Sequence, residues 1–141
     1  MSFTGNWACN AFKTGLMNGT FNFTSGTFKI ALYTNDATLD ATTAAYTATG
    51  EVVASGYTAG GQPLTITQTP TTGTSGTTAY ISFQNVAWNA AITARGALIY
   101  QSGGGDPAVC VLDFGADKTS NSVFTVQFPA PANTSAIIRI S

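Results

Sequence analysis

The sequence contains no histidine and few charged residues of either sign. Its five Lys or Arg and six Asp or Glu make up 8% of the 141 residues, whereas an average globular protein has about 25%. Without histidine, the chain lacks the commonest general base and metal ligand, and every Ser-His or Cys-His nucleophile pair. We therefore expect no enzymatic activity and no catalytic, cofactor-binding or metal-binding residue.

The few positive charges are spread along the chain and form no cluster: Lys13, Lys29, Arg95, Lys118 and Arg139. This distribution predicts neither nucleic-acid binding nor attraction to an anionic membrane surface. No apolar run approaches the ~20 residues of a membrane span, and residues 1–19 lack the pattern of a secretory signal. A surface with so little charge lacks the usual repulsion between proteins, which indicates that neighbouring proteins cover much of it.

Cysteine is also scarce, since the chain has only Cys9 and Cys110. The two residues share no short spacing of the kind that binds a metal. We interpret them as two buried, reduced thiols, but a disulfide between them stays open because sequence alone cannot place them in space.

The length suits one domain that can bury a core without disulfides or metals. Only residues 6–18 have a helical pattern, with Asn6 placed to cap the start and Gly19 to end it. The apolar residues on one side of this predicted helix are Trp7, Ala8, Ala11, Phe12 and Leu16. We expect residues 1–20 to form an N-terminal helix or extended arm, and residues 21–141 a single β domain.

After residue 21 the apolar residues follow the two-residue period of a β-strand. The segments with this pattern, of which the second and third are weaker, are 27–34, 45–53, 63–67, 79–86, 93–101, 108–114, 122–128 and 135–140. They are rich in β-branched and aromatic residues, with Gly, Pro, Asn and Ser between them. The predicted fold is all-β with about eight strands, an antiparallel β-sandwich or jelly roll.

Two long polar segments, 34–51 and 67–78, have the composition of flexible linkers but lie between strong strands. Long loops inside a compact domain are usually functional or disordered. Two interpretations of these segments stay open. They are either loops that contact a partner surface or mobile, solvated loops.

The tripeptide Asp113-Phe114-Gly115 is the magnesium-binding motif of protein kinases, but its context is wrong. A kinase also needs a glycine-rich phosphate loop, a strand lysine and a catalytic loop, and this chain is too short to hold them. The segment 102–106, Ser-Gly-Gly-Gly-Asp, lacks the Lys-Ser/Thr of a P-loop. Nucleotide binding is therefore not expected.

The tripeptide fits better as part of a β-hairpin centred on Gly104. Antiparallel pairing about that centre predicts these opposite pairs: Ile99 with Val109, Leu98 with Cys110, Ala97 with Val111 and Arg95 with Asp113. Opposite charges paired across two strands stabilise a sheet by about 0.2–1 kcal/mol. In this interpretation Phe114 turns toward the core, and Gly115 begins a turn over residues 115–118.

The remaining acidic and aromatic residues carry no strong motif. Asp36 and Asp40 share a loop, but the spacing of a calcium-binding loop is absent, and Asp106, Asp113 and Asp117 lie elsewhere. Trp7 and Trp88 both lie in apolar patterns, so we expect both in the core.

Several segments together resemble a family of small structural proteins of tailed bacteriophages, from about residue 21 to 141. They include Thr93–Tyr100 ("TARGALIY") and Val111–Thr119 ("VLDFGADKT"). The resemblance implies a virion component and no catalytic residue. We favour a capsid cement, or decoration, protein located on the capsid surface, with the major capsid protein and copies of itself as partners.

Two other classes of function stay open. One is a tail, neck or fibre-associated component of the same virion. The other is a receptor- or carbohydrate-binding β-sandwich, for which Tyr33, Tyr46 and Tyr57 are the available aromatic residues.

Overall fold

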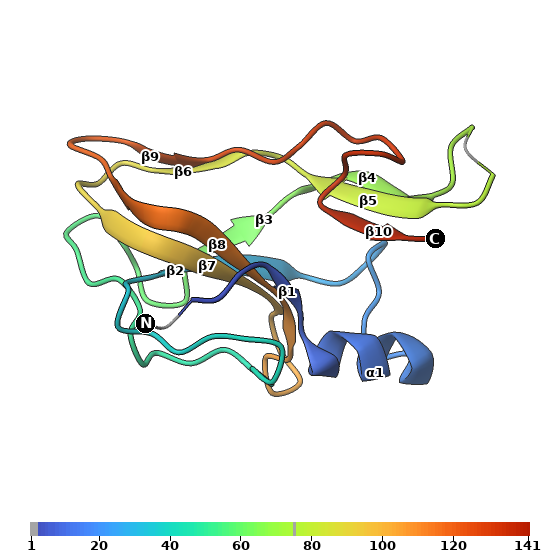
Figure 1. Cartoon of the computed structure of the whole chain (residues 1–141), viewed down its shortest axis with the longest axis horizontal. Helices are drawn as coiled ribbons and strands as arrows, with labels where there is room; N and C mark the ends of the chain where they lie inside the picture. Colours follow the sequence, from blue (N-terminus) through green and yellow to red (C-terminus); the bar gives the residue numbers. More distant parts are fainter. Residues whose placement is uncertain (1–2, 75) are drawn as a thin grey trace.

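The computed structural model describes residues 3–74 and 76–141 (Figure 1). The predicted segment 1–20 and the predicted loop 67–78 therefore each include residues outside the described part. In chain order the elements are β1 (Trp7–Ala8), α1 (Asn10–Asn18), β2 (Phe28–Tyr33), β3 (Gln62–Leu64), β4 (Ile66–Thr71), β5 (Ala79–Phe83), β6 (Val86–Trp88), β7 (Thr93–Gln101), β8 (Ala108–Thr119), β9 (Phe124–Val126) and β10 (Ile138–Ile140). The prediction of an all-β chain with antiparallel pairing is confirmed.

The central element is a five-stranded sheet in the order β1-β8-β7-β2-β3. Along β2, the side chains of Phe28, Ile30 and Leu32 enter one core cluster, as the alternation predicts. The side chains of Ala31 and Tyr33 enter a second cluster on the opposite face. Both faces of this sheet are therefore covered, which explains why nearly all of β2 is buried.

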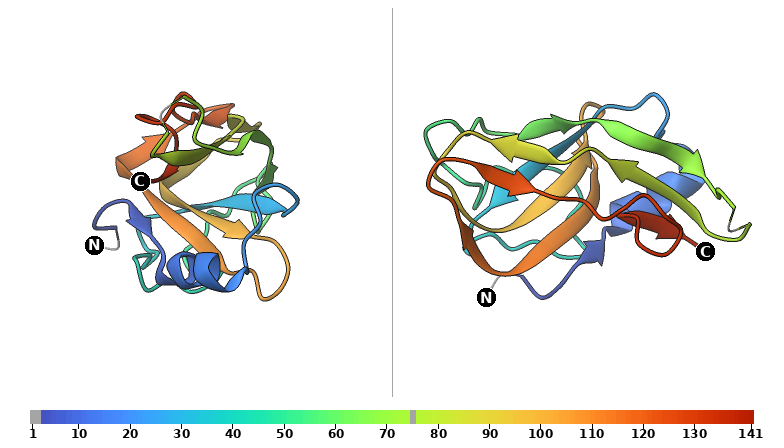
Figure 2. Two further views of the ribbon diagram at one scale, coloured as in Figure 1. Left: turned by 90° about the vertical axis from the view of Figure 1, so that its right-hand side faces the viewer. Right: turned by 90° about the horizontal axis from the view of Figure 1, so that it is seen from above.

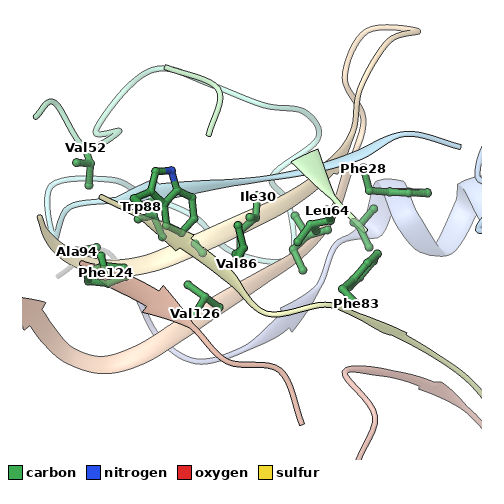
Figure 3. Packing of buried hydrophobic residues seen from close by; sticks show 14 of the residues in the cluster. Phe28, Ile30, Val52, Leu64, Phe83, Val86, Trp88, Ala94, Phe124 and Val126 are labelled. Carbon is green, nitrogen blue, oxygen red and sulfur yellow. The ribbon is translucent and has the colours of Figure 1, made fainter. Parts of the chain in front are cut away.

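Two smaller sheets, β10-β5-β4 and β6-β9, lie over one face of the five-stranded sheet (Figures 1 and 2). Their apolar residues meet those of β2 and β7 in the larger cluster (Figure 3). Trp88, predicted to be in the core, is 2% exposed and packs between Tyr57 and Phe124. The predicted inward face of residues 122–128 is also confirmed, because Phe124 and Val126 are buried in the larger cluster and Phe128 packs against it.

Residues 34–46 and the N-terminal segment cover the other face of the sheet. Leu39 and Phe3 are both 1% exposed in the smaller cluster. The segment 34–51 therefore packs against the sheet through Ala37 and Leu39, while many of its other residues stay exposed. The weak strand predicted over residues 45–53 is wrong, because only the isolated bridges Ala45–Pro107 and Tyr33–Glu51 form there. The backbone of this segment bonds distant strands only at separate points, for example through the Tyr46 N–H to the Asp106 carbonyl and the Val52 N–H to the Leu32 carbonyl.

The helix α1 begins four residues later than the pattern predicts. Residues Trp7 and Ala8 pair with β8 instead, opposite Val111 and Cys110, because the edge of β8 supplies backbone partners for them. The predicted end is confirmed, since Gly19 adopts the left-handed conformation with φ of 81°. Trp7 is 40% exposed, so its predicted place in the core is wrong.

The predicted loop 67–78 is also partly wrong, because β4 extends through it to Thr71 and pairs with β5. This pairing has irregular register and leaves no residue of β4 buried, which explains why its sequence has the polar composition of a loop. Within the described residues, no helix has the length and apolar character needed to cross a membrane.

Candidate functional site

The β7–β8 hairpin has a different register from the predicted one. Tyr100 pairs with Ala108, which fits a hairpin centred on Gly104. From Ile99 onward, however, the partners are shifted by one, so that Ile99 lies opposite Cys110 and not Val109. The same shift places Leu98 opposite Val111 and Ala97 opposite Leu112. A β-bulge in β8 causes the shift, and sequence alternation alone does not reveal such an extra residue.

The predicted ion pair forms even though the predicted register is wrong. Arg95 Nε lies 3.0 Å from Asp113 Oδ1, and both side chains are 12% exposed. In the ladder, Asp113 is opposite Gly96, while Ala94 is opposite Lys118. This second irregularity leaves residues 114–117 of β8 opposite Arg95 alone, and the distorted backbone brings the two charged side chains together.

Gly115 lies in this irregularity and not in a turn. Its φ is 82°, and its N–H donates to Asp113 Oδ1 at 2.8 Å. The predicted turn over 115–118 is wrong, because β8 continues to Thr119. Phe114 packs against the larger core cluster as predicted, with its ring 6.2 Å from that of Phe124. The kinase-like tripeptide therefore has a structural role in a bulged strand.

Partial burial of the Asp113 carboxylate acts to raise its pKa. The hydrogen bonds from the Gly115 N–H and from Arg95 act in the opposite direction and outweigh it, so the pKa of Asp113 is lowered. The Asp113 backbone N–H also donates to Asn6 Oδ1 at 2.6 Å. Asn6, predicted to cap the helix, therefore contacts β8 instead.

Two of the three tyrosines considered for ligand binding converge on a buried carboxylate, Glu51. Tyr46 and Tyr57 donate their hydroxyls to its two oxygens at 2.5 and 2.7 Å, and the Gly60 N–H donates at 2.7 Å. Tyr33 donates to the Thr47 carbonyl at 2.6 Å. Glu51 is 7% exposed, so these bonds hold residues 46–60 against the sheet. Sequence reasoning missed Glu51, although it is the only glutamate of the chain and has tyrosines on both sides.

The pKa values of these tyrosines and of Tyr100 are all raised. Burial raises the pKa of Tyr33, Tyr46 and Tyr57, and the nearby Glu51 carboxylate raises it further. Burial, together with the charges of Asp106 and Glu51, raises the pKa of Tyr100 to about 12. The hydroxyls therefore stay protonated and act as hydrogen-bond donors inside the protein.

The acidic residues considered for metal binding do not come together. Among the residues that the structure describes, no three His, Cys, Asp or Glu side chains gather in a metal-binding arrangement. Asp40 accepts hydrogen bonds from Thr42, and Asp106 accepts one from the Gly103 N–H. These carboxylates therefore stabilise local turns.

Cys9 and Cys110 are free thiols and form no disulfide. Cys9 belongs to the smaller core cluster and Cys110 packs against the larger one, so the two side chains lie on opposite faces of the sheet. Burial raises the pKa of Cys9 to about 11 and that of Cys110 to about 12. Both thiols are consequently poor nucleophiles at neutral pH.

The best candidate for a binding surface is a groove with a volume of about 510 Å³, which we call the α1–β10 groove. It is lined by β1, α1, the middle of β8 and the C-terminal strand β10. Cys110 and Leu112 are among its β8 residues. Its volume lies within the range of about 300–1,000 Å³ that is usual for ligand pockets.

Exposed apolar side chains gather around this groove. Six large hydrophobic side chains are exposed among the described residues, and four of them line the groove: Trp7, Leu16, Met17 and Ile140. Met17 is 83% exposed. A second hollow of about 420 Å³, beside β9, includes only Val123 from that set. Clustered exposed apolar surface with a polar rim is typical of a site that binds another molecule.

The charged residues that line the groove are both basic, Lys13 and Arg139. Arg139 donates one hydrogen bond to the Thr134 carbonyl at 2.8 Å and stays exposed. Sequence analysis missed this surface, because residues 7–17 and 137–140 are far apart in the chain. The available signal was the pair of apolar residues Leu16 and Met17 near the end of a helix that also carries polar residues.

Comparison with known proteins identifies no relative of this chain. A scan of protein-family models gives no match, and searches of curated proteins and of solved structures give no significant match. The likeness to bacteriophage structural proteins therefore stays a prediction from the sequence.

Proposed function

We propose that this chain is a bacteriophage virion structural protein, and specifically a capsid cement protein that binds and stabilises the assembled head shell. In this proposal the chain has no catalytic role, and its fold is a β-sandwich. One layer is the five-stranded sheet, and the other consists of β10-β5-β4 and β6-β9.

The observation that carries the proposal is the apolar surface around the α1–β10 groove. Trp7, Leu16, Met17 and Ile140 are exposed together at one place. Burial of apolar surface stabilises an interface by about 25 cal/mol per Å², before the costs of association are subtracted. This surface and the low overall charge both favour a protein that docks on the major capsid protein or on copies of itself.

A cement protein stabilises the shell through mass action. It binds the assembled lattice more tightly than the free capsid subunit, so its binding free energy opposes disassembly. Repeated docking around a symmetry axis adds avidity to contacts that are individually modest.

The receptor-binding alternative is disfavoured by the positions of its proposed residues. Tyr33 is 0% and Tyr57 is 9% exposed, and both hydroxyls donate hydrogen bonds within the protein. They are therefore not presented to a sugar. The tail or neck alternative is distinguished only by location in the virion.

Electron microscopy of virions labelled through this chain tests the proposal. We expect label over the whole icosahedral shell, and shells with the protein should withstand heating that opens shells without it. Label confined to the tail or neck would support the alternative component. Absence of the chain from purified virions would overturn both.

A matched pair of variants tests the surface itself. Met17→Asp places a charge in the exposed apolar patch and should abolish shell binding without unfolding the domain, since Met17 is 83% exposed. Lys118→Glu changes charge at an exposed position outside the groove and should leave shell binding unchanged. Equal binding by both variants would show that docking uses another surface.

A further inference from the structure

The α1–β10 groove runs between two strands that each form the outer edge of a sheet. β1 is the outer strand of the five-stranded sheet, and β10 is the outer strand of the sheet β10-β5-β4 (Figure 2). Outer strands present backbone N–H and C=O groups that lack a neighbouring strand, and an extended peptide can pair with such an edge.

The residues of β10 show that the groove follows its edge. The four consecutive residues 137–140 all line it, whereas a groove under one face would be lined by alternate residues. A smaller hollow beside it is lined by Ile138 and Ile140 but not Arg139, as expected for a surface under one face. The lining by consecutive residues thus places the groove along the edge of β10.

The charges of the groove indicate what kind of segment it fits. Its walls are mostly apolar, its charged lining residues are Lys13 and Arg139, and no Asp or Glu among the described residues lines it. A basic charge at such a position attracts carboxylates and disfavours basic partners. A segment with alternating apolar and acidic side chains would bury its apolar side chains in the groove and pair its carboxylates with Lys13 and Arg139.

We propose that the α1–β10 groove binds an extended segment of a partner protein that carries apolar and acidic side chains and pairs with β10 as an added strand. This inference rests on the proposed function in taking the groove as a protein-docking surface. β10 spans three residues, Ile138–Ile140. At about 3.3 Å per residue, the paired part of the partner is about three to five residues long.

The test uses a displayed library of random peptides about ten residues long, selected on the full chain and counter-selected on the Met17→Asp variant. We expect enrichment of peptides in which apolar residues alternate with Asp or Glu. No enrichment, or enrichment of basic peptides, would overturn the proposal.

The best selected peptide is then measured by fluorescence anisotropy against matched variants. Lys13→Glu and Arg139→Glu should each weaken binding about tenfold, and added salt should weaken it further. Lys118→Glu is the control, and we expect no change because Lys118 lies outside the groove. Equal affinity for Lys13→Glu, Arg139→Glu and Lys118→Glu would refute the role of the groove charges.

N-methylation of the peptide backbone tests strand pairing. An added strand directs alternate N–H groups toward β10, so methylation at one set of alternate residues should abolish binding and methylation at the other should not. Equal effects of the two sets would refute strand addition.

Two further outcomes separate the inference from the proposed function. Sedimentation that shows a dimer abolished by Met17→Asp would assign the groove to a second copy and overturn the partner segment. Peptide binding in solution by a chain that is absent from virions would keep the inference and overturn the capsid role.

Discussion

Asp113→Ala and Asp113→Asn separate the two hydrogen bonds that one carboxylate oxygen accepts in the β7–β8 hairpin. Asp113 Oδ1 lies 3.0 Å from Arg95 Nε and 2.8 Å from the Gly115 nitrogen. Alanine removes the acceptor for both donors. Asparagine can keep a carbonyl oxygen for the Gly115 N–H, but it loses the charge that pairs with Arg95.

The burial of the pair sets the expected magnitude. A hydrogen bond to a charged group contributes about 1.5–3 kcal/mol, whereas an exposed ion pair contributes at most about 1 kcal/mol. Both side chains are 12% exposed, so this pair lies between those cases. We expect Asp113→Ala to lower the free energy of unfolding by about 2–3 kcal/mol and Asp113→Asn by about 1 kcal/mol.

Arg95→Ala should cost about 2 kcal/mol. It removes the ion pair and also uncovers Phe3, whose ring centroid lies 6.0 Å from the Arg95 guanidinium carbon. Urea unfolding of the two single variants and the double variant gives the coupling energy, which we expect to be about 1 kcal/mol. The exposed Lys118→Ala variant serves as a control and should couple to neither.

Exchanging the two charges adds a second measurement. Arg95→Asp alone should destabilise the fold, and adding Asp113→Arg should restore only part of the loss. The arginine introduced at position 113 has no acceptor for the Gly115 N–H, so full recovery is not expected. A coupling energy below about 0.3 kcal/mol, or no recovery on exchange, would refute the pair as a stabilising contact in solution.

The pKa of Asp113 gives the pH dependence of the same contact. Because the folded-state pKa is lowered, the contribution to stability is complete above the unfolded pKa of about 3.9 and is lost as pH falls through the folded value. The stability difference between the native chain and Asp113→Asn should therefore shrink in acid. A difference that stays constant down to the acid limit of folding would contradict this linkage.

Three further measurements test the rest of the fold. Gly61→Ala should cost at least about 3 kcal/mol, because the new Cβ would lie 1.8 Å from the Ile30 carbonyl oxygen. Gly19→Ala, with φ of 81° and open space around it, should cost only about 1 kcal/mol, and equal thermal shifts would refute the clash. Tyr57→Phe should cost about 2–3 kcal/mol in urea unfolding, since its hydroxyl bonds both Leu32 N–H and Glu51; an unchanged midpoint would contradict this. Cys9 should react with a thiol reagent at pH 8 only after unfolding, because it is 0% exposed and its pKa is about 11; rapid labelling of Cys9 in the native protein would refute its burial.

The two-residue alternation of apolar side chains predicted the positions of the main core strands well. Residues 93–101 and 108–114 lie in β7 and β8, and the inward residues of 122–128 pack as expected. Alternation failed for β1, because two residues pair only when β8 offers its edge. It also failed for β4, where exposed polar residues carry no apolar period.

The candidate binding surface was not predictable from local pattern. Met17 and Ile140 are separated by most of the chain, yet they line one groove. The tyrosines were predicted as potential contacts for a ligand, but Glu51 draws Tyr46 and Tyr57 inward. Both outcomes depend on contacts between distant segments, for which the sequence carries no periodic signal.

From the sequence alone come the all-β class, the antiparallel pairing, the inward residues of the main strands and the association of Arg95 with Asp113. These follow from short-range rules. Side chains alternate between the two faces of a strand, and opposite charges on neighbouring strands of a hairpin attract each other. Only the tertiary structure assigns the bulges that displace the register, the loop that covers the second face and the groove beside β10. Each of these depends on many long-range packing contacts. Around the bulge in β8, Val109 and Val111 enter core clusters on opposite faces, so the apolar pattern does not mark the register there.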